Sequence, residues 1–175
     1  MTSENHLSGT DRIAEVTRKE KNADIIINIQ GDEPLVDFKV IDNLIDSFKD
    51  INVNMSTVIS KSLSIHDLID PNVVKVMIDE KFNAVNFKRE VLDIDIGGLY
   101  RHIGMYAYRR ETLLHFSNLP ITKSEELTNL EQMRAIDNGI LIKTILTNSL
   151  QLSVDTKEDL KKVKEIMRSN SELYN

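Results

Sequence analysis

Two carboxylates stand side by side in residues 28–36, NIQGDEPLV, directly after an apolar run. Asp32 and Glu33 follow the β-branched segment 24–29, whose lack of alternation is typical of a central strand covered on both faces. In a mostly parallel sheet, ligands bind beyond the carboxyl ends of the strands. Carboxylates at that edge can hold Mg²⁺ together with substrate phosphates. The alternative is a solvated turn, because Gly, Asp, Glu and Pro are ordinary loop residues.

Further polar residues stand in three other segments. Asp155, in SVDTKEDL (153–160), lies where a strand-like end meets a helix start, so it either caps that helix or points into a site. Polar residues among apolar ones occur in RHIGMYAYR and NLEQMR: Arg101, His102, Glu131, Gln132 and Arg134. Each suits a plain surface face, and His102 also suits a satisfied half-buried histidine. Spacing alone leaves these alternatives open.

Composition narrows the class of protein. The chain has 175 residues, of which 41% are hydrophobic, so we expect one domain over residues 1–175. Its net charge of −6, without a block of Lys and Arg, argues against nucleic acid as a partner. The absence of cysteine excludes disulfides, thiolate metal sites and a cysteine nucleophile. We find no membrane-length apolar run and no signal-peptide pattern, and we therefore expect a cytoplasmic protein that does not bind a membrane.

Strand-like and helix-like segments alternate along the chain. After the strand at 24–29, apolar residues from Val40 to Phe48 recur at helical spacing. We predict further strands at 55–60, 73–78, around Tyr106 and at 141–146, and further helices at 11–18, 110–116, 126–138 and 157–167. Thr156 and Asp159 resemble a capping box for the last helix. This alternation predicts an α/β fold with a mostly parallel sheet.

Five segments give the chain a family resemblance: HLSGTDRIAEV, NIQGDEPLV, RHIGMYAYRRETL, LEQMRAIDNG and SVDTKEDLKKV. In order and approximate spacing they resemble the 3-deoxy-manno-octulosonate cytidylyltransferases, or CMP-Kdo synthetases, from about His6 to Met167. The resemblance implies a Rossmann-like nucleotide-diphospho-sugar transferase fold. It also implies transfer of CMP from CTP to the anomeric hydroxyl of 3-deoxy-manno-octulosonate (Kdo), with release of pyrophosphate, for lipopolysaccharide biosynthesis.

The resemblance also implies a set of functional residues. Asp32 and Asp155 would converge on Mg²⁺, which would neutralise the α-phosphate and orient the sugar hydroxyl for attack. Arg89, in NFKRE, stands where the family has a phenylalanine, serine, arginine run and is a candidate for binding the sugar or its carboxylate. The other implied substrate-binding residues are Ser8, Gly9, Thr10, Arg12, Gln30, His102, Glu131 and Gln132.

Two departures from the family pattern affect what we expect. Family members open with a strand and a loop rich in Arg, Ser and Lys that binds the triphosphate, whereas this chain starts at MTSENHLSGT, so we expect an N-terminally truncated fold. None of the six glycines forms a substitute phosphate loop. We therefore expect weak CTP binding and slow turnover by the chain alone, and an unpaired strand edge. After Arg89, the sequence EVLDIDIGGLYRH replaces a proline-containing loop.

The expected partners follow from the same resemblance. CTP and Kdo are the expected small-molecule substrates, and a homodimer is expected as in the family. A complementing N-terminal chain, a truncated reading frame and a degenerate remnant are three explanations of the first departure. A CMP-sialic acid synthetase-like enzyme is one alternative function, although QGDEP and LEQMR favour Kdo. A non-catalytic protein for binding or dimerisation is another.

Overall fold

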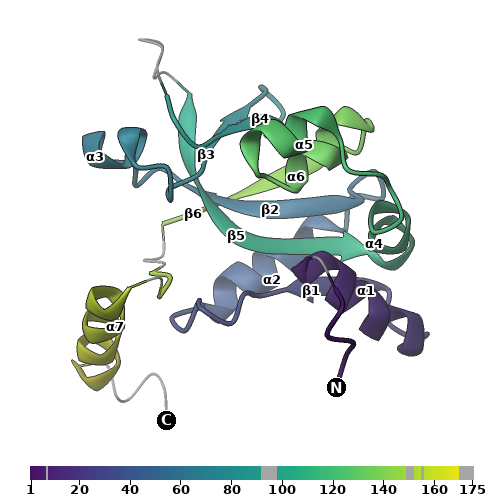
Figure 1. Ribbon diagram of the computed structural model, residues 1–175, viewed down its shortest axis with the longest axis horizontal. Coiled ribbons are helices and arrows are strands. Elements are labelled where there is room, and N and C mark those ends of the chain that lie inside the picture. Colours follow the sequence, from purple (N-terminus) through teal and green to yellow (C-terminus); the bar gives the residue numbers. More distant parts are fainter. Residues whose placement is uncertain (7, 92–97, 149–151, 155, 170–175) are drawn as a thin grey trace.

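The fold consists of a twisted central sheet with helices packed against both of its faces (Figure 1). The computed structural model describes residues 1–6, 8–91, 98–148, 152–154 and 156–169. The described helices are α1 (Gly9–Lys19), α2 (Phe38–Ser47), α3 (Ile65–Ile69), α4 (Arg110–Phe116), α5 (Lys123–Thr128), α6 (Gln132–Asp137) and α7 (Lys157–Ser169). The described strands are β1 (Ile25–Asn28), β2 (Met55–Ser60), β3 (Lys75–Ile78), β4 (Ala84–Lys88), β5 (Leu99–Arg109) and β6 (Ile142–Thr147). Within these ranges, no helix has both the length and the apolar composition needed to cross a membrane.

The sheet is mixed, and β5 organises it. Strands are ordered β4-β3-β5-β2-β6, and β1 also pairs with β5. β5 is antiparallel to β1, β2 and β3, whereas β2 and β6 are parallel, with Met55 beside Ile142. The α/β fold is therefore confirmed. The expectation of a mostly parallel sheet is wrong, because β5 pairs antiparallel with three strands. With 11 residues, β5 is long enough to pair with both β1 and β3 along one side.

β1 is not the central parallel strand that its isoleucines suggested, although Ile26 packs against one core and Ile25 and Ile27 against the other. It pairs antiparallel with β5, in the register Ile25 to Arg109, and Ile25, Ile26 and Ile27 are partly exposed. β-Branched residues favour an extended backbone without specifying the direction of the neighbouring strand. The run therefore predicted the strand and its contacts on both faces correctly, and its central position and parallel direction wrongly.

Two hydrophobic cores lie on the two faces of the sheet. One lies between the sheet and α1, α4 and α6; its buried residues include Ala14, Met55, Ile59, Tyr108, Leu113, Phe116 and Ala135. The other lies between the sheet and α2; its buried residues include Val40, Leu44, Val58, Ile103 and Met105. Residues 103, 105 and 107 of β5 face α2, while His102, Tyr106 and Tyr108 form a row of rings on the opposite face.

The helix predicted over 126–138 consists of two helices. Asn129 has a φ of 52°, in the left-handed region, and it ends α5. The chain then restarts as α6, with Glu131 at its N-cap position. The helices at 110–116 and 157–167 are confirmed, and the Thr156–Asp159 capping box forms through hydrogen bonds of 2.9 and 3.2 Å between each backbone amide and the other side chain. Because of the break before α6, Glu131 stands at the start of a helix and not within one.

Candidate functional site

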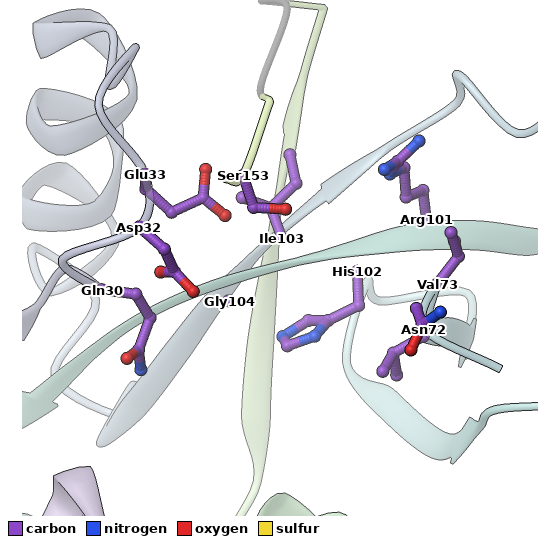
Figure 2. A pocket seen from close by; sticks show the side chains of 11 residues that line it. Gln30, Asp32, Glu33, Asn72, Val73, Arg101, His102, Ile103, Gly104 and Ser153 are labelled. Carbon is purple, nitrogen blue, oxygen red and sulfur yellow. The ribbon is translucent and has the colours of Figure 1, made fainter. Parts of the chain in front are cut away.

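A polar cavity of about 200 Å³ opens where the loop after β1 meets the middle of β5 (Figure 2). Its lining comes from the loop after β1, the segment before β3, strand β5 and the segment after β6. The lining residues are Gln30, Asp32, Glu33, Asn72, Val73, Val74, Arg101, His102, Ile103, Gly104 and Ser153. Gln30 lies across Gly104, where an added Cβ would be 3.7 Å from the Gln30 Cγ. Carboxylates therefore line one side of the cavity, and Arg101 and His102 line the other (Figure 2).

Asp32 stands in a short turn that the chain holds on two sides. The amide of Glu33 donates to the carbonyl of Gln30 at 3.2 Å, which closes the turn after β1. The amide of Val154 donates to the carbonyl of Asp32 at 2.8 Å, which brings the segment after β6 against this turn. Asp155, the next residue, lies outside the described residues. Among the residues that are described, no three His, Asp or Glu side chains gather as a metal site.

His102 lines the cavity and also belongs to the row of rings on β5. Its Nε2 lies 2.9 Å from the Thr57 hydroxyl of β2, and its ring packs edge-on against Phe87 at 5.2 Å. Burial lowers the pKa of His102 to about 3, because the charged ring would lose its hydration. His102 is therefore a neutral hydrogen-bonding group at physiological pH.

Tyr106 is a candidate site residue that the sequence reasoning missed. Its ring lies 5.3 Å from that of His102, on the same face of β5. Its buried hydroxyl is near Thr57, yet it makes no hydrogen bond of normal geometry to any described residue. Burial raises the pKa of Tyr106 well above its usual value, with smaller contributions from Tyr108 and Glu131. The signal in the sequence was the even spacing from His102, because alternate strand residues share one face.

Two of the predicted residues, Thr10 and Glu131, meet between α1 and α6. Ser8 caps α1 by accepting a hydrogen bond from the Asp11 amide at 3.1 Å, which places Gly9 and Thr10 in the first turn. The Thr10 hydroxyl donates to Glu131 Oε2 at 2.6 Å. Gln132, next to Glu131, is buried at the start of α6. Thr10 and Glu131 thus come together although they lie 121 residues apart in the sequence, and Ser8 caps the helix that carries Thr10.

Arg12 and Arg89, the two arginines predicted to bind substrate, form hydrogen bonds within the chain. Arg12 donates to the Thr2 hydroxyl at 2.5 Å and to the Ser3 carbonyl at 3.1 Å. Arg89 donates to three backbone carbonyls, at 2.9 to 3.2 Å, at the end of α5 and in the loop after α3. Their proposed roles toward substrate stay predictions, as does the N-terminal truncation.

Comparisons with known proteins identify the family. A cytidylyltransferase family model matches residues 1–145. The 3-deoxy-manno-octulosonate cytidylyltransferase of Fusobacterium nucleatum is 40% identical over 98% of this chain, which spans 72% of that protein. The enzyme of the same name from Solibacter usitatus is also 40% identical, over 97% of this chain and 69% of its own length.

Solved structures agree with the sequence comparisons. A CMP:2-keto-3-deoxy-manno-octonic acid synthetase complexed with CTP superimposes with a TM-score of 0.88 and 34% identity, covering 97% of this chain and 71% of that one. An inositol-1-phosphate CTP transferase from T. maritima, at 22% identity and a TM-score of 0.57 over 89% of this chain and 60% of that one, shows the shared fold alone. The matched family model, the identity of the relatives and the fold all agree, and this chain belongs to the cytidylyltransferase family.

Proposed function

We propose that this chain transfers CMP from CTP to the anomeric hydroxyl of Kdo, with release of pyrophosphate. The observation that carries this proposal is the 40% identity, over 98% of the chain, to a 3-deoxy-manno-octulosonate cytidylyltransferase. The solved relative complexed with CTP supports CTP as the nucleotide. The cavity beside β1 and β5 is the place where we expect the two substrates to meet.

The acidic side of the cavity suits a magnesium ion. The carboxylates of Asp32 and Glu33 both reach toward the open space in Figure 2. Mg²⁺ prefers a small number of carboxylates together with substrate phosphates. We propose Asp32 and Asp155 as its ligands, supported by the hydrogen bond from Val154 to Asp32. Bound Mg²⁺ would offset the negative charge of the CTP phosphates.

The opposite side of the cavity suits a sugar acid. Neutral His102 can exchange hydrogen bonds with hydroxyl groups, and Tyr106 has a buried hydroxyl without a well-formed partner among the described residues. Arg101 lines the cavity, and its Nη1 is 3.7 Å from a carboxylate oxygen of Asp67. A guanidinium in that position can receive the carboxylate of Kdo. These residues would hold the sugar while the carboxylates opposite face the nucleotide.

Pyrophosphate release tests this function directly. The purified chain is incubated with CTP and Mg²⁺, with Kdo in one series and N-acetylneuraminate in the other, and calorimetry measures the binding of each sugar. We expect release that depends on Kdo and exceeds that with N-acetylneuraminate by at least about tenfold, the discrimination of about one well-made polar contact. Equal rates with both sugars, or failure to bind Kdo at millimolar concentration, would contradict the proposal.

A further inference from the structure

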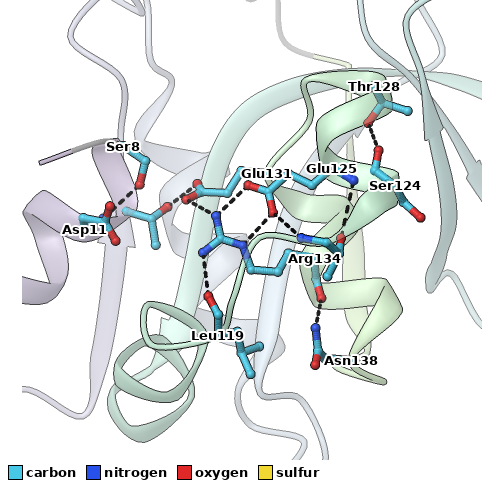
Figure 3. Close-up of polar contacts among 11 residues, drawn as sticks. Ser8, Asp11, Leu119, Ser124, Glu125, Thr128, Glu131, Arg134 and Asn138 are labelled. Carbon is cyan, nitrogen blue, oxygen red and sulfur yellow. Dashed lines mark hydrogen bonds and ion pairs between the residues drawn. The ribbon is translucent and has the colours of Figure 1, made fainter.

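The Glu131 carboxylate lies where α1, α5 and α6 approach one another (Figure 3). Glu131 occupies the N-cap position of α6, but its side chain makes no capping hydrogen bond. Its Oε2 instead accepts the 2.6 Å hydrogen bond from Thr10 of α1. Its Oε1 is buried and has no hydrogen-bond partner within the part of the chain that the structure describes. A buried carboxylate oxygen of this kind is expensive unless a ligand or a nearby charge compensates it.

Arg134, on the next turn of α6, is held from several directions. Its Nε and Nη2 donate to the two oxygens of Glu125 at 2.7 and 2.6 Å, as a fork. Its Nη1 donates to the Leu119 carbonyl at 3.3 Å, and its guanidinium lies over the Phe116 ring at 5.3 Å. The side chain is only 8% exposed. Such a set of contacts leaves the guanidinium little freedom to turn.

The charged groups of Arg134 and Glu131 lie close together without a hydrogen bond between them. Arg134 Nη2 lies 3.6 Å from Glu131 Oε1, which is too long for a hydrogen bond and short enough for strong attraction in a poorly hydrated place. The positive charge therefore compensates the carboxylate without forming a hydrogen bond to Oε1. The same guanidinium therefore bonds to Glu125 and lies beside Glu131 without a hydrogen bond to it.

We propose that Arg134 is a positioning residue that holds Glu131 Oε1 ready to accept a hydrogen bond from a hydroxyl group of the sugar. This inference rests on the proposed function, because the ligand is the sugar acid. Thr10 fixes one oxygen of Glu131, and Arg134 fixes the place and charge of the other. The charge of Glu131 contributes to the raised pKa of Tyr106, whose ring lies 5.3 Å from the ring of His102 in the cavity wall.

A purely structural role for Arg134 makes a different prediction. If the Arg134–Glu125 pair served only to fasten α5 to α6, removing either partner would lower stability and affect sugar binding equally. If Arg134 positions Glu131, loss of Arg134 must also displace the Glu131 carboxylate and weaken sugar binding. Glu125→Gln breaks the same ion pair and leaves the charge beside Glu131, so it is the matched control for Arg134→Gln.

The experiment combines crystal structures, melting temperatures and calorimetric titration of Kdo into the full chain. In Arg134→Gln we expect the Glu131 carboxylate to leave Thr10 and the affinity for Kdo to fall on the order of tenfold, the value of one hydrogen bond to a charged group. In Glu125→Gln we expect a lower melting temperature, an intact contact between Thr10 and Glu131, and an affinity within about twofold. Arg134→Lys, which retains the charge without the fork, should fall between them.

Each outcome bears on a specific claim. An unmoved Glu131 in Arg134→Gln, or an equal loss of Kdo affinity in Glu125→Gln, would overturn the positioning role. Arg134→Lys binding as poorly as Arg134→Gln with Glu131 in place would overturn it too. Displacement of Glu131 in Arg134→Gln, in a chain that binds no Kdo even when unsubstituted, would support positioning by Arg134 and contradict the proposed function.

Discussion

The backbone amide of Val154 donates a 2.8 Å hydrogen bond to the carbonyl oxygen of Asp32. This bond joins the loop after β1 to the segment between β6 and α7, two parts of the chain that the sequence keeps far apart. Asp155 follows directly after the anchored residue. The backbone of Asp32 is thus held against Val154, the residue that precedes Asp155 in the sequence.

Asp32→Asn and Asp155→Asn should each reduce pyrophosphate release by about 100-fold or more, because each removes a charge proposed to hold Mg²⁺ and preserves side-chain volume. Calorimetry should also show that CTP binding no longer tightens when Mg²⁺ is added. Asp42→Asn, at an exposed position of α2, is the matched control and should change neither measurement. Unchanged Mg²⁺ dependence in either site variant would return that aspartate to an ordinary loop or capping role.

Lowering the pH should destabilise the protein through His102. Its pKa is about 3 in the folded chain, against about 6.5 when unfolded. Between these values the unfolded chain binds a proton that the folded chain does not, so stability is complete above pH 6.5 and falls as the pH falls. At pH 4 this term reaches at most roughly 3 kcal/mol.

Urea unfolding at several pH values checks this prediction. His102→Gln should flatten the dependence of the unfolding free energy on pH between 6.5 and 4. His66→Gln, at an exposed position of α3, should leave it as in the unsubstituted chain. An identical slope in all three proteins would show that His102 accepts a proton in the folded state.

Tyr106→Phe should separate binding from stability. The Tyr106 hydroxyl lacks a normal hydrogen bond among the described residues, so its removal should leave the free energy of unfolding unchanged or slightly raised. If that hydroxyl binds the sugar, the affinity for Kdo should fall about fivefold to tenfold. Tyr108→Phe, which removes a hydroxyl that interacts with Thr10, should instead cost about 1 kcal/mol of stability. Full Kdo affinity in Tyr106→Phe would remove Tyr106 from the proposed site.

Lys75→Met should destabilise the wall of the cavity. Lys75 is fully buried in β3, and its Nζ donates to the carbonyls of Asp70 and Arg89 at 2.8 and 2.5 Å. Methionine fills a similar volume but leaves both carbonyls unpaired, which should cost about 1–3 kcal/mol of unfolding free energy. Urea unfolding measures this loss, with Lys61→Met at an exposed position as the control. Equal stability of the two variants would show that water replaces the ammonium group.

The sequence by itself determined the elements and the family. Segments 55–60 and 110–116 were predicted with the bounds that the structure has, because strand propensity and apolar periodicity depend on nearby residues. The five ordered motifs led to the family that the comparisons confirm. Chemistry-bearing residues such as Asp32 and His102 were also visible, and both line one cavity.

Only the tertiary structure decided how those residues are used. The three isoleucines of β1 look the same in a central parallel strand and in a half-exposed antiparallel one, because strand direction depends on residues elsewhere in the chain. Arg134 and Glu131 are neighbours on any helix, but their hydrogen-bond partners Glu125 and Thr10 arrive from α5 and α1. Local sequence cannot encode such partners, since the free energy that selects them comes from packing several elements at once.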